Sequence, residues 1–225
     1  MIKVILMRKI IVSNFLSLDG VIQSPGGPEE DPTNSFRWGG WTANFWDEIM
    51  QHAMADTMKD PYDLLLGRKT YEIFAAHWPY TGDEVSDKFN RITKFVVSGK
   101  QRELSWANSV LITGDVVDRL SVLRKEDGPD LVVYGSAHLV QTLLSNGLVD
   151  LLNLWIFPVT IGSGKRFFEE GTVPANWKLL NTTTSSTGVT IVTYEPSGQL
   201  KPGSFALDPP TEAELKRREN LRREG

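Results

Sequence analysis

A chain of 225 residues with a formal net charge of −4 and no cysteine is long enough to bury one hydrophobic core. The acidic balance argues against a general binder of nucleic acids or anionic membranes, because both need a clustered positive field. The missing cysteine excludes disulfides, thiolate nucleophiles, iron–sulfur clusters and zinc–cysteine sites, and it fits a cytoplasmic protein.

The first predicted elements are a strand, a long loop and a helix. The strand is expected over residues 9–15, where β-branched residues dominate. Residues 23–42 form a predicted loop rich in glycine, proline and acid, and its Trp38 and Trp41 indicate a functional rather than a disordered segment. Apolar residues near helical spacing predict a helix over residues 43–58.

Strands alternate with helices further along the chain, which predicts a mostly parallel sheet. The expected strands cover residues 64–66, 94–98, 110–113 and 130–134, and the expected helices begin at residue 68 and cover residues 116–124 and 138–144. The last three strands, over residues 151–159, 177–184 and 189–194, have no helix between them, which predicts an antiparallel C-terminal hairpin. We therefore expect one α/β domain over residues 1–195, with helices flanking the sheet.

Residues 196–225 are predicted to form a polar tail. Thr211 and Glu214 have the spacing of a capping box, which indicates a short helix, but few apolar residues are present for it to bury. A solvated or disordered tail is therefore favoured over a partner-binding helix. Nowhere does an apolar run approach the ~18 residues of a membrane-spanning helix, so we expect a soluble protein with no membrane partner.

Residues 63–72, with the sequence DLLLGRKTYE, carry the most functional information. The three leucines predict a buried strand, and Gly67 lets the backbone turn at its end, so that a helix begins with Arg68, Lys69 and Thr70. A helix start offers free N–H groups and a partial positive charge, to which these residues add two cations and a hydroxyl. The junction is therefore a candidate phosphate site, and the alternative is an ordinary strand–helix turn with a basic surface.

Two later junctions repeat this pattern. Ser98, Gly99 and Lys100 follow a strand and suit a phosphate, although a plain surface turn explains them equally well. The third junction joins a strand to a helix through Gly135, Ser136, Ala137, His138 and Leu139. Small residues there let the backbone approach a pyrophosphate, although the G-x-G-x-x-G fingerprint is absent. Together the junctions predict anion sites along the carboxyl edge of the sheet.

Other chemical signals are weak. The three histidines lie far apart in sequence and lack metal-ligand spacing, so no metal site is predicted. No serine stands in a G-x-S-x-G context, which sets hydrolase chemistry aside.

Four motifs, taken in order, resemble the dihydrofolate reductase superfamily. They are residues 17–20 (SLDG), 66–72 (LGRKTYE), 133–139 (VYGSAHL) and 158–164 (PVTIGSG), the last followed by Phe167 and Phe168. The resemblance covers roughly residues 8–195, and the closest branch is the reductase domain of the riboflavin-biosynthesis deaminase-reductase. This family implies NADPH as hydride donor, a mostly parallel sheet with an antiparallel C-terminal hairpin, and often a homodimer.

The resemblance also implies roles for residues by position. The turn of Gly67, Arg68, Lys69 and Thr70 would meet the NADPH phosphates, and Ser98, Gly99 and Lys100 would lie near the 2′-phosphate. Gly135, Ser136, Ala137, His138 and Leu139 would cradle the pyrophosphate. Asp19 would sit by the nicotinamide, where it is the candidate for polarising the substrate or positioning a proton-delivering water.

Candidates for the substrate site are Trp38, Trp41, Phe45, Asp47, Glu48 and Tyr134. The loop of Trp38 and Trp41 would close over the pocket. Pyrimidine reductases of this branch tend to carry a glutamate just before the glycine turn, where this chain has Tyr134. Folate reductases place a carboxylate on the first helix, and Asp47 and Glu48 lie on the matching helix, with a solvated helix face as the alternative.

We therefore expect an NADPH-dependent reductase of a small nitrogen heterocycle or an imine, resembling 5-amino-6-(5-phosphoribosylamino)uracil reductase of riboflavin biosynthesis. The alternatives are a dihydrofolate reductase acting on a pterin and a nucleotide-binding homologue without turnover. A homodimer is also expected, because residues 151–157 carry too many large apolar groups for one face to be left in water.

Overall fold

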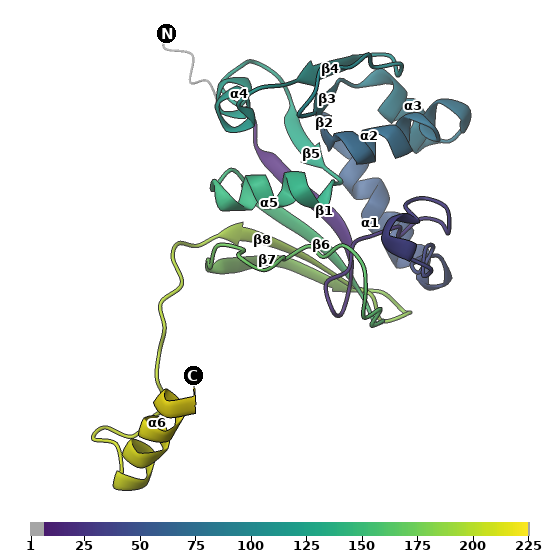
Figure 1. Cartoon of the computed structure of the whole chain (residues 1–225). Helices are drawn as coiled ribbons and strands as arrows, with labels where there is room; N and C mark the ends of the chain where they lie inside the picture. The colour runs from purple at the N-terminus through teal and green to yellow at the C-terminus, as the bar shows by residue number, and fades with distance from the viewer. Residues whose placement is uncertain (1–6, 225) are drawn as a thin grey trace.

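The computed structural model describes residues 7–224. The body of the protein contains one eight-stranded sheet of order β4-β3-β2-β5-β1-β6-β8-β7 (Figure 1). The strands are β1 (Ile10–Ser17), β2 (Tyr62–Gly67), β3 (Lys94–Val97), β4 (Ser109–Ile112), β5 (Asp130–Val133), β6 (Leu151–Phe157), β7 (Trp177–Thr184) and β8 (Thr190–Pro196). The helices are α1 (Glu48–Lys59), α2 (Arg68–Ala75), α3 (Glu84–Arg91), α4 (Val116–Leu123), α5 (Ala137–Ser145) and α6 (Glu212–Glu224). The domain predicted to begin at residue 1 thus has its first six residues outside the described range.

The sheet is parallel from β4 to β6 and antiparallel beyond. β1 pairs in parallel with β5 and β6, β2 with β3 and β5, and β3 with β4. β8 pairs antiparallel with both β6 and β7. The predicted α/β fold, with a mostly parallel sheet and an antiparallel C-terminal hairpin, is confirmed.

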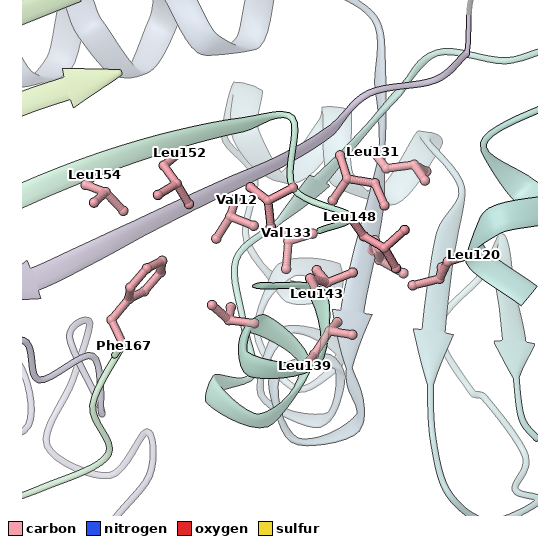
Figure 2. Packing of buried hydrophobic residues seen from close by; sticks show 14 of the residues in the cluster. Val12, Leu120, Leu131, Val133, Leu139, Leu143, Leu148, Leu152, Leu154 and Phe167 are labelled. Carbon is pink, nitrogen blue, oxygen red and sulfur yellow. The ribbon is translucent and has the colours of Figure 1, made fainter. Parts of the chain in front are cut away.

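Helices cover both faces of the parallel part of the sheet. On one face, α4 and α5 bury Leu120 and Leu143 in the main hydrophobic cluster (Figure 2). On the other face, α2 and α3 contribute Tyr71 and Phe89 to a second cluster, and α1 contributes Met50 to a third. Successive strand residues point to opposite faces, which is why one sheet separates these clusters.

The first helix begins later than the sequence pattern predicts. A helix is expected over residues 43–58, whereas α1 begins at Glu48 and Ala43–Phe45 form a 3₁₀ turn. The reason is Asp47, whose carboxylate accepts a hydrogen bond from the Met50 backbone N–H at 2.8 Å and caps the helix. An N-cap residue has non-helical backbone angles, so the apolar residues before it cannot extend α1. The predicted N-terminal end of this helix is therefore wrong.

The C-terminal tail ends in α6, which lies away from the sheet in Figure 1 and buries no side chain. Thr211 Oγ1 accepts a hydrogen bond from the Glu214 N–H at 3.2 Å, which is half of the predicted capping box. The Glu214 carboxylate pairs with Arg217 and Arg218 instead. The tail is thus exposed, as expected, and helical. Neither α6 nor any other helix within residues 7–224 is long and apolar enough to cross a membrane.

The strand that suggested a second subunit is covered within the chain itself. β6 lies between β1 and β8. Leu152 and Leu154 face the cluster under α5, whereas Trp155 and Phe157 face the cluster under α1. Its apolar side chains therefore need no second subunit, and the homodimer stays a prediction without support from this strand.

β7 forms the outer edge of the sheet, and its pairing is irregular. The register with β8 shifts between Leu179 and Asn181. Lys178 pairs with Glu195 of β8 at 2.9 Å, and Leu179 and Leu180 are about half exposed. This edge is neither flat nor uniformly apolar.

Lys94 places a charged side chain inside the core. Its Nζ donates hydrogen bonds to the carbonyl oxygens of Phe89 (2.9 Å) and Asn90 (3.2 Å), and it lies 4.5 Å from the ring centroid of Trp106. Burial disfavours the ammonium and lowers the pKa of Lys94 to about 8, although the charge of Asp63 opposes this shift. The side chain holds the end of α3 against the start of β3.

We expect Lys94→Met to remove a pH dependence of stability. From about pH 8 to 10 the unfolded chain keeps this lysine protonated and the folded chain does not. The free energy of unfolding of the wild type should therefore rise with pH relative to the variant, by up to about 2 kcal/mol. Urea unfolding across this range measures the difference. Lys178→Met, which alters an exposed lysine, is the control, and parallel curves for wild type and Lys94→Met would contradict the assignment.

Candidate active site

The carboxyl ends of the parallel strands lie along one edge of the sheet. At this edge the neighbouring strands β2 and β5 send their helices to opposite faces, because α2 packs in the cluster of Tyr71 and α5 in the cluster of Leu143. Ligands of α/β proteins bind outside the strand ends at such a point. The junctions predicted after β2, β3 and β5 are thus brought to a common edge.

β1 and β5 separate at this edge. Their pairing ends at Val12 and Val133, although β1 continues to pair with β6 as far as Ser17. The Asn14 side chain reaches across, since its Nδ2 donates a hydrogen bond to the Tyr134 carbonyl at 3.1 Å. Its Oδ1 is buried and has no hydrogen-bond partner among the described residues. Because an unpaired buried acceptor costs free energy, this atom suits an N–H donor from a ligand.

The turns after β2 and β5 touch through their backbones. The Gly67 N–H donates to the Gly135 carbonyl at 3.0 Å. A Cβ at Gly67 would lie 2.2 Å from Ser136 Oγ, and a Cβ at Gly135 would lie 2.8 Å from Thr70 Oγ1. Gly135 also has a φ of +132°, which side chains rarely adopt. Both positions require glycine, and the contact holds two helix starts side by side.

These two helix starts have backbone N–H groups to offer. The N-cap residues Gly67 and Ser136 make no side-chain cap hydrogen bond. Within residues 7–224, no side chain caps the first amides of α2 and α5, and the partial positive charge of both helix ends favours an anion. Lys69 is exposed in the first turn of α2. In α5, His138 is exposed and the Leu139 side chain is buried in the core, so Leu139 offers a ligand only its backbone.

The predicted turn after β3 uses its hydroxyl internally. Ser98 Oγ donates to the Lys100 carbonyl at 2.9 Å and accepts from Arg102 Nε at 3.2 Å. Gly99 and Lys100 are exposed. Ser98 therefore stabilises the turn through these hydrogen bonds, and Arg102 adds a positive charge beside it.

Arg102 and Arg68 share one carboxylate. Glu72 Oε1 lies 2.7 Å from Arg102 Nη1, and Glu72 Oε2 lies 2.9 Å from Arg68 Nη1. Glu72 thus holds two guanidinium groups, one from α2 and one from the β3–β4 loop, close to one another.

Asp19 joins the turn after β1 to the loop after β6. Its carboxylate accepts hydrogen bonds from the Ser17 hydroxyl (2.7 Å), the Ile161 N–H (3.0 Å) and the Gly162 N–H (2.8 Å), and Arg166 lies 3.6 Å away. Desolvation opposes ionisation, but these hydrogen bonds outweigh it and lower the pKa of Asp19 to about 2. At neutral pH the carboxylate carries no proton to donate, and its geometry is that of an anchor between two loops.

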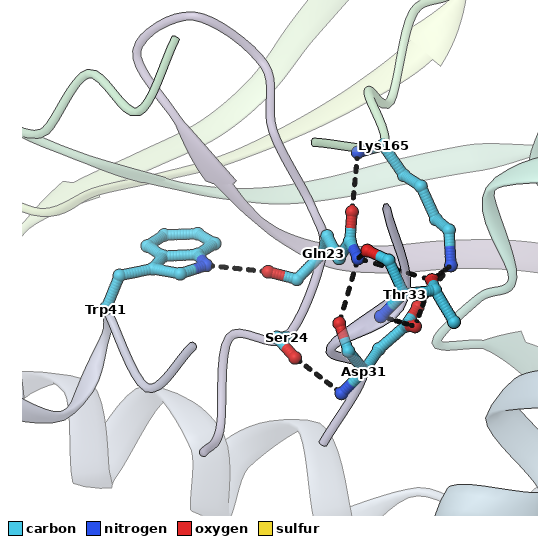
Figure 3. A network of polar contacts seen from close by, with 6 residues as sticks. All are labelled: Gln23, Ser24, Asp31, Thr33, Trp41 and Lys165. Carbon is cyan, nitrogen blue, oxygen red and sulfur yellow. Dashed lines mark hydrogen bonds and ion pairs between the residues drawn. The ribbon is translucent and has the colours of Figure 1, made fainter. Parts of the chain in front are cut away.

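The aromatic candidates differ in their surroundings. Trp41 and Phe45 contact Phe157 edge to face under α1, with ring centroids 5.3 and 5.9 Å apart. Trp41 Nε1 also donates to the Gln23 carbonyl at 2.9 Å (Figure 3). Trp38 is 58 % exposed. In this loop the Trp38 side chain is thus exposed, whereas Trp41 is held by a hydrogen bond and by packing against Phe157.

Asp47, Glu48 and Tyr134 do not meet in one site. Besides capping α1, Asp47 accepts hydrogen bonds from Ser186 N and Oγ, both at 2.7 Å, in the β7–β8 turn. The hydrogen bonds from Met50 and Ser186 lower the pKa of Asp47. Glu48 is exposed. Tyr134 packs against aromatic rings of α2 and α3, and burial raises the pKa of Tyr134 to about 12.

Sequence reasoning missed three residues at this edge. Arg102 lies two positions beyond the predicted Lys100 turn, Lys165 directly follows the 162–164 motif, and Asn14 is a polar residue inside an apolar strand. The sequence next to each residue hints at a role, but the residue that each one binds lies far away in the chain.

Comparison with known proteins identifies the family of this chain. Residues 8–191 match the RibD C-terminal domain family. The uncharacterized protein YyaP of Bacillus subtilis is 30 % identical over 200 residues, which cover 85 % of this chain and 96 % of YyaP.

Two solved structures share the fold. A putative riboflavin biosynthesis protein from Shewanella sp. PV-4 has a TM-score of 0.60 at 21 % identity, over 84 % of this chain and 99 % of that one. Dihydrofolate reductase from Enterococcus faecalis, complexed with NADP(H), has a TM-score of 0.52 at 16 % identity, over 86 % and 97 % of the two chains. The resemblance read from the motifs is confirmed, and the chain belongs to the RibD C-terminal domain family.

Proposed function

We propose that the protein is an NADPH-dependent reductase of a small nitrogen heterocycle or an imine. The observation that carries this proposal is the contact between Gly67 and Gly135, which brings two helix starts without side-chain caps to one point of the sheet edge. Such a pair offers backbone N–H groups to a pyrophosphate. Family membership, and the fold shared with a reductase complexed with NADP(H), support the same cofactor.

The residues at this edge fit NADPH, which supplies the hydride when bound. The contact between the two glycine turns leaves no room for a Cβ on either residue, and it holds the two helix starts together. The first amides of α2 and α5, with Thr70, would hold the pyrophosphate. Arg68 and Arg102 would exchange the Glu72 carboxylate for the 2′-phosphate. Asn14 Oδ1 would accept a hydrogen bond from the carboxamide.

The substrate would lie against aromatic side chains. Trp41 and Phe45 suit a flat ring and exclude water from it. A folate reductase is less well supported, because the Asp47 carboxylate is already bound to Met50 and Ser186.

NADPH oxidation tests the proposal. The chain is titrated with NADPH, and oxidation is then followed with a phosphoribosylaminouracil, a cyclic imine or dihydrofolate. We expect turnover with one of the first two. Turnover with dihydrofolate alone would support a folate reductase, tight NADPH binding without turnover would support a homologue that only binds nucleotides, and no NADPH binding would contradict the proposal.

The double variant Arg68→Ala, Arg102→Ala should bind NADPH more weakly and NADH about as well as the wild type. A charge-assisted hydrogen bond to a phosphate contributes ~1.5–3 kcal/mol, so NADPH affinity should fall about 10- to 100-fold while NADH affinity changes little. Equilibrium titration of both cofactors measures this, with Lys178→Ala as a control far from the edge. An equal loss for the two cofactors would show that these arginines do not hold the 2′-phosphate.

Asp19→Asn should lower the free energy of unfolding and leave the rate of hydride transfer nearly unchanged. The Ile161 and Gly162 N–H groups would lose a charged acceptor, which costs about 1–3 kcal/mol. Because its folded pKa is about 2, below the ordinary value, Asp19 contributes stability above about pH 4 that the wild type loses as the pH falls toward 2. The variant should lack that acid dependence in urea unfolding. A single-turnover hydride transfer about 10²-fold slower, with NADPH affinity unchanged, would instead give Asp19 a catalytic role.

A further inference from the structure

Glu72 binds two arginines that come from different parts of the chain. Within α2, Arg68 Nη1 donates to both carboxylate oxygens of Glu72, at 3.2 Å to Oε1 and at 2.9 Å to Oε2. Arg102, which lies 30 positions further on in the β3–β4 loop, donates from Nη1 to Oε1 at 2.7 Å. One carboxylate thus offsets part of the positive charge that the two guanidinium groups bring to this edge.

The Glu72 carboxylate can accept more than these contacts supply. Among residues 7–224 it receives three hydrogen bonds, two on Oε1 and one on Oε2, whereas a carboxylate can accept about four. The side chains of Glu72, Arg68 and Arg102 are 46 %, 39 % and 29 % exposed, so a ligand can reach all three groups. Oε2 is therefore able to accept a further hydrogen bond from a hydroxyl group.

The position of Arg102 depends on two contacts. Its Nε donates to Ser98 Oγ at 3.2 Å in the turn after β3, and its Nη1 donates to Glu72 of α2. The guanidinium group is thus held between a neutral hydroxyl and a carboxylate. Of these two partners, only the carboxylate competes with an anion for the arginine.

We propose that Glu72 is a specificity-determining residue that lowers the preference for NADPH over NADH, so that the protein binds both cofactors. This inference rests on the proposed function, in which Arg68 and Arg102 receive the 2′-phosphate. A phosphate must replace Glu72 on the arginines and is repelled by its charge. The 2′-hydroxyl of NADH instead donates a hydrogen bond to Oε2 and leaves both ion pairs intact.

Equilibrium titration of NADPH and NADH into the wild type and Glu72→Gln tests this inference. Glutamine keeps the size of the side chain and removes its charge at an exposed position, so the fold should be unaffected. We expect NADPH affinity to rise about 3- to 10-fold, because the phosphate no longer competes with a carboxylate. NADH affinity should fall about 2- to 3-fold, because its hydroxyl meets a neutral acceptor. Adenosine 2′-phosphate, which lacks the nicotinamide half, should gain affinity as NADPH does.

Glu195→Gln is the matched control, because it also removes one exposed carboxylate from an ion pair, with Lys178 at the antiparallel end of the sheet. It should change neither affinity. If Glu72 only holds the arginines in position, Glu72→Gln will weaken NADPH, which overturns the inference. Equal changes for both cofactors, including none, or a wild type that binds NADPH but not NADH, overturn it and leave the reductase function intact. A wild type that binds neither cofactor contradicts the proposed function and this inference with it.

Discussion

The contact between the turns at Gly67 and Gly135 leaves no room for a Cβ on either residue, and the arrangement of the functional edge follows from it. Because the two backbones touch, β2 and β5 end together, and α2 and α5 leave to opposite faces from one point. The positive ends of two helices meet there, which is unfavourable without a negative group nearby. The backbone alone therefore favours an anion at this edge, before any basic side chain is counted.

Polar contacts organise the loops around this edge, together with the packing of Trp41 against Phe157. Asp19 binds backbone N–H groups of the loop after β6, and Gln23 accepts a hydrogen bond from Lys165 of the same loop. Within loop 23–42, Ser24 accepts a hydrogen bond from the Asp31 N–H at 2.6 Å. Loops near the surface satisfy their backbone groups in this way without a core of their own. The same contacts join these loops to one another.

Local signals made much of the fold predictable. The strand, glycine and helix start in residues 63–72 are contiguous in sequence, and the structure keeps them in that order. The roles of Asp47 and Lys165 depend instead on partners 139 and 134 residues away, Ser186 and Asp31. No local pattern contains such a contact. A capping carboxylate and a substrate-binding carboxylate therefore look alike in sequence, and a lysine next to a glycine turn gives no sign that it binds a distant carboxylate.

The irregular edge strand β7 has a consequence for self-association. A register shift at Leu179 and a lysine at position 178 are features by which natural sheets resist the addition of another strand. Two copies of this chain are therefore not expected to join their sheets through β7, although Leu180 next to the shift is about half exposed. This edge of the sheet is therefore expected to resist aggregation by strand addition at high concentration.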